Sequence, residues 1–293
     1  MRLRQGWRQQ GRHEAGMGSW GWFQAVGLGH HDGITARHNM SHFIDDLVDA
    51  NQILFHQGIV DAFGHVSVRS PSDPQRFYLS RNVAPGQVTA ADIIEYQVSD
   101  AEPASANAPR GYLERCIHSE IYKLRPDVMS VVHSHSPGVL PFCISGKARL
   151  RPVCHMCGFL GDEAGDEPSD EPNAEQSSGP PIFEIRDHAG DASDLLIRNR
   201  ALGAALAHTL GNAKLVLMRG HGSTVVGETL RVAVYRAVYT EVNAKLLLQA
   251  LALGDVNYLT LGEARATRAT VEGQAQRPWD LWRMQAQAAR AVS

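Results

Sequence analysis

Residues 128–138, VMSVVHSHSPG, and residues 215–227, LVLMRGHGSTVVG, decide how this chain folds and what it can bind. Each stretch begins as a short apolar run of the kind that forms a buried strand, and each run leads to histidine. Side chains alternate between the faces of a strand, so His133 and His135 point the same way, about 7 Å apart along the backbone. His221 lies between two glycines just after the second run.

These three histidines suggest a metal site. Zinc, manganese and iron sites commonly take three protein ligands and leave a position for water or substrate. A single histidine is most often an ordinary hydrogen-bonded residue, but the two-residue spacing at one strand end and the glycine-flanked histidine at another favour a metal. We therefore predict one divalent ion per subunit, Zn²⁺, Mn²⁺ or Fe²⁺, bound by His133, His135 and His221. The residue types do not choose among these metals.

The remaining pattern predicts a single α/β domain. Apolar residues recur at helical spacing from Ser41, which can cap a helix, to Gly58. The turn-rich SPSDPQ at 70–75 predicts a hairpin between strands 65–69 and 77–80. Beyond it, the sequence predicts helices over 112–124, 193–210 and 229–253 and strands over 128–133 and 214–218.

Glu114 lies in the first turn of the predicted helix 112–124, which precedes the strand that carries His133 and His135. A carboxylate at this position either complements the helix dipole or belongs to the metal site, and the pattern alone does not choose. His118 lies one turn further along the same helix face, where it can orient Glu114.

Composition limits the classes of partner and the compartment. The 293 residues carry a net charge of -3 and show no basic stripe, so we expect no nucleic-acid partner. The first 37 residues contain no apolar stretch of signal-peptide or membrane-span length, which favours a cytoplasmic protein without a membrane partner. Four cysteines do not suggest a disulfide scaffold, and the C-x-x-C pair Cys154 and Cys157 lacks the second pair that a zinc knuckle needs.

We expect four segments along the chain. Residues 1–38 form an N-terminal extension, 39–260 form the catalytic domain, and 261–293 form a C-terminal tail. Residues 161–181, rich in acidic residues, Pro, Ser and Gly, predict a flexible surface insertion. Trp279 and Trp282 in the tail either cover the active site as a lid or anchor the terminus to the domain.

The order and spacing of these motifs resemble the class II aldolase/adducin family from about residue 41 to residue 255. The motifs are Glu114-x-x-x-His118-x-x-x-Tyr122, RPDVMSVVHSHS at 125–136 and MRGHG at 218–222 before a long helix. The resemblance implies a three-layer α/β/α domain around a mostly antiparallel sheet. It implies that His133, His135 and His221 bind the metal, and that Glu114 is the acid/base residue and also contacts the ion. It further implies a homotetramer with active sites near subunit boundaries.

The chain departs from the sugar-phosphate aldolases of that family at their phosphate site. They have Gly-Asn-x-Ser, a Thr/Ser-Gly element and a Ser-Ser pair, whose small residues can wrap a phosphate. The corresponding residues here are Gly64-His65-Val66-Ser67, Ser80-Arg81-Asn82 and Tyr112-Leu113. A guanidinium, an imidazole and an aromatic ring suit a planar carboxylate instead. VDAFGHVSVR at 60–69 and YLSRNVAP at 78–85 resemble the branch of decarboxylases that act on hydroxylated aromatic dicarboxylates.

We therefore predict a metal-dependent decarboxylase of a dihydroxyphthalate-like or hydroxypyridine-dicarboxylate-like substrate, with the ion as Lewis acid and Glu114 as acid/base. Arg81 and His65 would hold the second carboxylate of the substrate. Ser80, Asn82 and Tyr112 complete the predicted contacts, and Arg219 either reaches the substrate or pairs with an acid. His155 either lines the pocket or packs in the core.

Two other functions stay open at this point. One is an aldolase or epimerase that acts on a small hydroxy-carbonyl or sugar-phosphate-like substrate, because the ion and the base would be identical. The other is a non-catalytic interaction module like adducin, against which the presence of all three histidines and Glu114 argues.

Overall fold

A computed structural model describes residues 32–161 and 179–292, with only the backbone described for 32–41 and 292. Nearly all of the predicted acidic insertion, 161–181, and residues 1–31 of the predicted extension therefore lie outside the described residues. No helix in the described ranges is both long enough and apolar enough to cross a membrane.

A seven-stranded sheet with the order β3-β2-β1-β4-β7-β6-β5 forms the centre of the fold. Every pair of neighbouring strands is antiparallel except β5 and β6, which are parallel, so the predicted mostly antiparallel sheet is confirmed. The strands are β1 (His65–Arg69), β2 (Arg76–Ser80), β3 (Ile93–Gln97), β4 (Ser130–Ser134), β5 (Ile182–Phe183), β6 (Leu215–Met218) and β7 (Gly222–Gly227).

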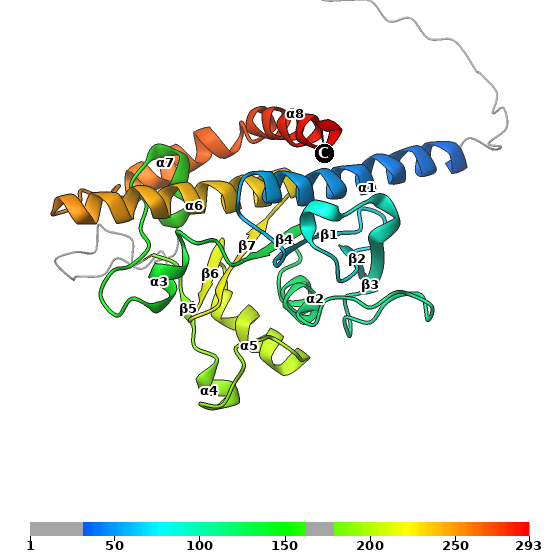
Figure 1. Ribbon diagram of the computed structural model, residues 1–293, viewed down its shortest axis with the longest axis horizontal. Helices are drawn as coiled ribbons and strands as arrows, with labels where there is room; N and C mark the ends of the chain where they lie inside the picture. Colours follow the sequence, from blue (N-terminus) through cyan, green and yellow to red (C-terminus); the bar gives the residue numbers. More distant parts are fainter. Residues whose placement is uncertain (1–31, 162–178, 293) are drawn as a thin grey trace, which may run out of the picture.

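Helices cover both faces of this sheet and complete the predicted three layers (Figure 1). One layer contains α1 (Asp32–His56), α6 (Leu230–Leu253), α7 (Leu261–Glu272) and α8 (Gln276–Val292). The opposite layer contains α2 (Arg115–Leu124), α4 (Arg186–Ala189) and α5 (Arg200–Leu210), and the short α3 (Leu140–Ile144) follows β4. Alternate residues of β4 supply the two apolar cores, since Val132 packs toward α1 and α6 and Val131 toward α2 and α5.

Several predicted boundaries are confirmed and three helix starts are corrected. Strand β1 has the predicted bounds, it forms the predicted hairpin with β2, and α6 starts after the Thr229 cap. In contrast, α1 begins at Asp32 rather than at Ser41, and α2 begins at Arg115 rather than at residue 112. Helix α5 begins at Arg200 instead of residue 193, because the Asn199 side chain caps it by accepting the Leu202 N–H at 3.0 Å.

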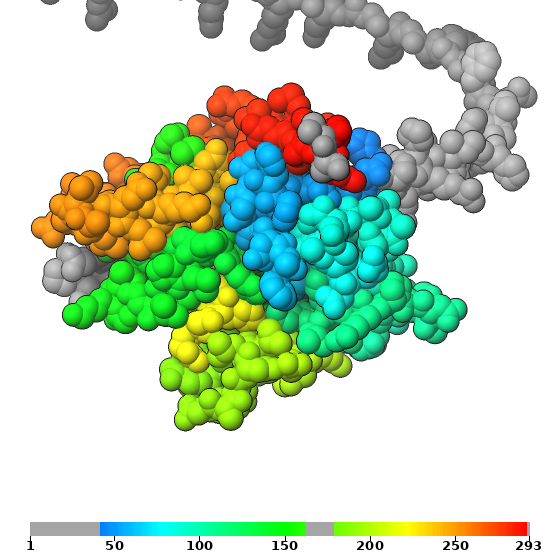
Figure 2. Space-filling view, in the orientation of Figure 1, coloured from blue at the N-terminus to red at the C-terminus, as the bar shows by residue number. Residues whose placement is uncertain are grey.

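The C-terminal helices belong to the folded domain. Trp279 is 1% exposed and Trp282 is 7% exposed, and both lie in the core cluster that includes residues of α1 and α6. The Trp282 ring packs against Tyr239 of α6 at a centroid distance of 5.9 Å. The space-filling view shows the red C-terminal helix lying against the blue α1 (Figure 2). Within this chain, the two tryptophans therefore anchor the C-terminal segment.

Candidate metal centre

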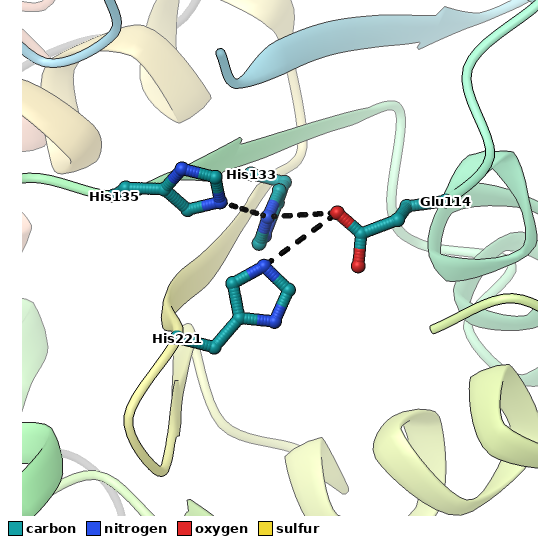
Figure 3. A group of neighbouring side chains, drawn as sticks. All are labelled: Glu114, His133, His135 and His221. Atoms are coloured by element: carbon teal, nitrogen blue, oxygen red, sulfur yellow. Dashed lines mark hydrogen bonds and ion pairs between the residues drawn. The ribbon is translucent and has the colours of Figure 1, made fainter. Parts of the chain in front are cut away.

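Glu114, His133, His135 and His221 converge on one point, and each offers a ligand atom within 4.8 Å of the others. Figure 3 shows the three imidazoles and the carboxylate facing this common centre. The Nε2 atoms of His133 and His135 are 3.1 Å apart, and Glu114 Oε2 lies 3.6 Å from His133 Nε2 and 3.5 Å from His221 Nε2. A tetrahedral site with ligand distances near 2.1 Å sets neighbouring ligand atoms about 3.4 Å apart. These spacings therefore fit a single divalent ion.

Strand pairing brings the histidines together. His133 is the last residue but one of β4, which is buried along its whole length, and β4 pairs with β7 so that Ser134 lies opposite Ser223. His221 immediately precedes β7 and so reaches the same sheet end as His135. Gly222 permits this approach, because a Cβ at that position would lie 2.2 Å from the Ser134 carbonyl oxygen.

Glu114 occupies the N-cap position of α2, but its side chain makes no capping hydrogen bond. Its Oε1 accepts the backbone N–H of Ile197 at 2.9 Å, and its Oε2 is left to face the histidines. The carboxylate is 10% exposed, so this orientation is held inside the protein. The sequence left open whether Glu114 complements the helix dipole or belongs to the metal site. This geometry favours the metal site.

The loop before α5 orients two members of the cluster, although the sequence predicted helix here. Its Ile197 N–H holds Glu114, and its Leu195 carbonyl accepts the Nδ1–H of His221 at 2.8 Å. Leu195 adopts a φ of 68°, a left-handed conformation that is uncommon for a residue with a bulky side chain. Such backbone strain is often retained where function requires it.

The protonation states of the histidines suit metal binding. His221 Nε2 is buried without a hydrogen-bond partner among the described residues, because the ring donates from Nδ1 to Leu195. His133 places its Nδ1 3.3 Å from Thr224 Oγ1, which leaves its Nε2 toward the cluster. Burial lowers the pKa of His133 well below its usual value and also lowers that of His135. Neutral imidazoles with free Nε2 lone pairs are the form that binds a cation.

Glu114 is ionised in this setting. Burial by itself raises the pKa of a carboxyl group, but any positive charge on the adjacent His221 or the nearby His133 and His65 lowers it by more. The net effect holds the pKa of Glu114 well below its usual value. The cluster therefore presents three nitrogens and one anionic oxygen, a set that zinc, manganese and iron accept.

A pocket of about 350 Å³ adjoins the cluster, a volume in the range of small-molecule sites. Glu114 and His135 form part of its wall, and apolar and aromatic side chains supply most of the rest. The other lining residues are Ala62, Phe63, Gly64, His65, Asn82, Val83, Ala84, Tyr112, Leu113 and Leu196. No residue from the described part of 261–293 lines this pocket.

The residues predicted to contact substrate divide into two groups. His65, Asn82 and Tyr112 line the pocket, and Ser80 lies behind it, where its hydroxyl is 3.1 Å from Tyr112 Oη. Arg81 and Arg219 instead pair with acids.

Arg81 Nε lies 2.6 Å from Asp92 Oδ1, and Arg219 Nε lies 2.6 Å from Glu184 Oε2. Of the two roles predicted for Arg219, contact with the substrate and pairing with an acid, pairing with an acid is the one observed. The substrate contact of Arg81 stays a prediction, because its side chain does not line the pocket in this conformation.

The predicted role of His118 was wrong. Helical spacing suggested that it orients Glu114, but its Nε2 lies 2.7 Å from His65 Nδ1 and its Nδ1 lies 2.6 Å from Ser67 Oγ. The reason is the sheet, since α2 turns this side chain toward β1. Sequence reasoning also missed Ile197 and Leu195, because backbone groups leave no signal in the residue type.

His155 and the two C-x-x-C cysteines lie away from the metal cluster. His155 is exposed and lines a separate cavity beside α6 and α8. The Sγ atoms of Cys154 and Cys157 are 3.2 Å apart, and a hydrogen bond from Cys157 lowers the pKa of Cys154 to about 7. These residues therefore take no part in the candidate centre.

Comparisons with known proteins agree with the geometry. Residues 45–248 match the family model described as Class II Aldolase and Adducin N-terminal domain. The chain is 42% identical over 252 residues to Decarboxylase tropJ of Talaromyces stipitatus, covering 78% of this chain and 88% of that protein. It is 29% identical over 214 residues to 3,4-dihydroxyphthalate decarboxylase of Arthrobacter keyseri, covering 70% and 77% of the two chains.

A solved structure extends the likeness to the fold. L-fuculose 1-phosphate aldolase from Glaciozyma antarctica superposes with a TM-score of 0.66 and covers 91% of this chain and 96% of that one. The identity is 21%, so this likeness concerns the arrangement of helices and strands alone.

Proposed function

Because the chain belongs to the class II aldolase and adducin family, we propose that it is a metal-dependent decarboxylase of a hydroxylated aromatic dicarboxylate. The observation that carries this proposal is the junction of the Glu114 and histidine cluster with a pocket walled by aromatic and imidazole rings. Two of its relatives, at 42% and 29% identity, are named as decarboxylases. Their names support carbon–carbon bond cleavage with loss of carbon dioxide rather than an aldol reaction.

The lining of the pocket favours a planar, anionic aromatic substrate rather than a sugar phosphate. Its wall includes the flat aromatic rings of Phe63 and Tyr112 and the apolar side chain of Leu113. Its polar groups come from His65 and Asn82. A phosphate site needs converging backbone amides and small hydroxyl groups, which these large side chains displace. We therefore place the ring of the substrate between the cluster and this wall.

The residues of the cluster perform the steps as follows. Ionised Glu114 accepts the proton of the ring hydroxyl and returns it to the ring carbon as carbon dioxide leaves, so that the proton count balances. A divalent ion bound by His133, His135, His221 and Glu114 would supply Lewis-acid charge for the electrons that the broken bond releases into the ring. The Leu195 and Ile197 backbone groups keep His221 and Glu114 oriented throughout.

The test is incubation of the purified, metal-loaded protein with 3,4-dihydroxyphthalate and with hydroxypyridine dicarboxylates while carbon dioxide release is followed. We expect release from at least one of these compounds, and none from monocarboxylate analogues that lack the ring hydroxyl. Turnover of an aldol donor without release from any aromatic dicarboxylate would replace the proposal with an aldolase or epimerase.

A further inference from the structure

A line of buried polar side chains runs from the pocket wall into the layer between β1 and α2. His65 Nδ1 lies 2.7 Å from His118 Nε2, and His118 Nδ1 lies 2.6 Å from Ser67 Oγ. Ser67 Oγ in turn lies 2.7 Å from the Tyr122 hydroxyl. All four residues are at most 3% exposed. We call this set, Tyr122, Ser67, His118 and His65, the relay.

The hydrogen-bond direction of the relay is set at its inner end. Ser67 is the acceptor that the described residues offer to the Tyr122 hydroxyl. Burial raises the pKa of Tyr122, so the phenol keeps its proton, and a buried hydroxyl proton needs an acceptor. Tyr122 therefore donates to Ser67. A serine hydroxyl has one proton, which is then left for His118 Nδ1.

The positions of the protons on the two imidazoles follow in the same way. Burial lowers the pKa of His118 to about 3, and His65 is 3% exposed with no carboxylate within hydrogen-bond distance in the described ranges, so each ring is neutral and has one proton. His118 accepts at Nδ1 and so donates from Nε2 to His65 Nδ1. His65 must then hold its own proton on Nε2. This nitrogen has no hydrogen-bond partner within the described ranges, and His65 lines the pocket.

The outer end of the relay faces a pocket that has no cationic side chain. Among the described residues that line the pocket there is neither lysine nor arginine, and Arg81 is paired with Asp92. A carboxylate accepts hydrogen bonds only, so a ring nitrogen with a lone pair would repel it and an N–H would bind it. The direction of the relay thus decides whether His65 attracts or repels an anionic substrate.

We propose that Tyr122, Ser67 and His118 are positioning residues that hold His65 as its Nε2–H tautomer, which donates a hydrogen bond to a carboxylate oxygen of the aromatic substrate. The ligand in this inference rests on the proposed function, whereas the tautomer does not. The relay therefore extends the substrate site into the interior by three residues that cannot contact the substrate themselves.

Nuclear magnetic resonance of the full-length protein labelled with ¹⁵N at histidine tests the tautomer, with and without added Zn²⁺. The His65 signals are assigned by their loss in His65→Gln. We expect His65 and His118 both to be neutral and protonated at Nε2. A His65 ring protonated at Nδ1 would overturn the inference whatever the enzyme turns over.

Kinetics with 3,4-dihydroxyphthalate test the consequence. In Ser67→Ala the link between Tyr122 and His118 is lost, so we expect a mixture of His65 tautomers and a rise in KM of about tenfold with little change in kcat. Tyr122→Phe should shift both quantities in the same direction. His65→Gln keeps an N–H donor toward the pocket and should retain more affinity than His65→Ala.

Ser130→Ala is the matched control. Ser130 is also a fully buried serine on the neighbouring strand, and its hydroxyl donates to the Ser67 carbonyl outside the relay. It should leave the His65 tautomer and KM unchanged. Equal effects of Ser67→Ala and Ser130→Ala, on either measurement, would reduce the relay to a structural hydrogen-bond network. If the unmodified protein does not turn over 3,4-dihydroxyphthalate, the proposed function loses support while the tautomer measurement still decides the relay.

Discussion

His65 and His133 lie directly opposite each other on the antiparallel strands β1 and β4, with ring centroids 5.0 Å apart. One belongs to the pocket wall and the other to the metal cluster. Because side chains alternate along both strands, a slip of the pairing by one residue would turn one of these imidazoles to the other face of the sheet. The register of this single strand pair thus fixes the position of the pocket wall relative to the histidine and Glu114 cluster.

Removal of a proposed metal ligand should abolish activity without unfolding the protein. We expect His221→Ala to lower decarboxylation by more than about hundredfold, because loss of groups that only orient metal ligands already costs about 10- to 100-fold. The measurement is carbon dioxide release at saturating metal. His208→Ala, which changes an exposed histidine on α5, should retain full activity. Equal activity of the two variants would exclude His221 as a ligand.

Glu114→Gln separates the charge of this residue from its position. Glutamine can still accept the Ile197 N–H, but it cannot accept and return a proton. We expect kcat to fall by about 10²- to 10⁴-fold, the range for loss of a general acid or base. Glu120→Gln, on the same helix but paired with Lys123 and Arg200, should leave kcat unchanged. A Glu114→Gln variant with normal kcat would remove the carboxylate from the chemistry.

The buried tryptophan of α8 should contribute to the stability of the domain. Trp279→Ala leaves a cavity in the core that α1, α6 and α8 share, so we expect a loss of about 3–5 kcal/mol in the free energy of unfolding. Urea denaturation monitored by circular dichroism measures this loss. Met284→Ala, at a position that is 61% exposed, should change the free energy by less than about 0.5 kcal/mol. A small effect at Trp279 would mean that the C-terminal helix leaves the core readily.

The paired cysteines should differ in reactivity. The Cys157 thiol donates toward Cys154 and stabilises its thiolate, so alkylation of Cys154 should rise with pH through a midpoint near its pKa of about 7. Burial raises the pKa of Cys157, which should stay unmodified at neutral pH. Mass spectrometry of peptides after iodoacetamide treatment reads both sites. Preferential modification of Cys157 would contradict this assignment.

Much of the fold and the convergence of the cluster could be predicted because they follow from local periodicity. The two-residue spacing of His133 and His135 fixes their common face on a strand, and His221 follows from the apolar run that ends beside it. The mostly antiparallel sheet did not follow from periodicity but was implied by the family resemblance, and it is confirmed. The homotetramer and the cytoplasmic location stay predictions.

The rest depends on contacts that sequence spacing does not encode. His118 follows Glu114 at helical spacing, but the neighbouring strand offers it Ser67 and His65 as nearer partners. The sequence of the segment before α5 predicts a helix. The segment is irregular instead, because its backbone groups form hydrogen bonds with Glu114 and His221. At the first place tertiary hydrogen bonds overrode the partner that helical spacing suggested, and at the second they overrode local helix propensity.

Elemental analysis of the purified full-length protein and of His133→Ala measures whether the histidine and Glu114 cluster holds a divalent ion. We expect about one divalent ion per chain in the unmodified protein, bound by three imidazoles and Glu114, and a near-complete loss of that ion in the variant. An unmodified protein that releases carbon dioxide from an aromatic dicarboxylate without a bound ion, or a variant that keeps its ion, would contradict this expectation.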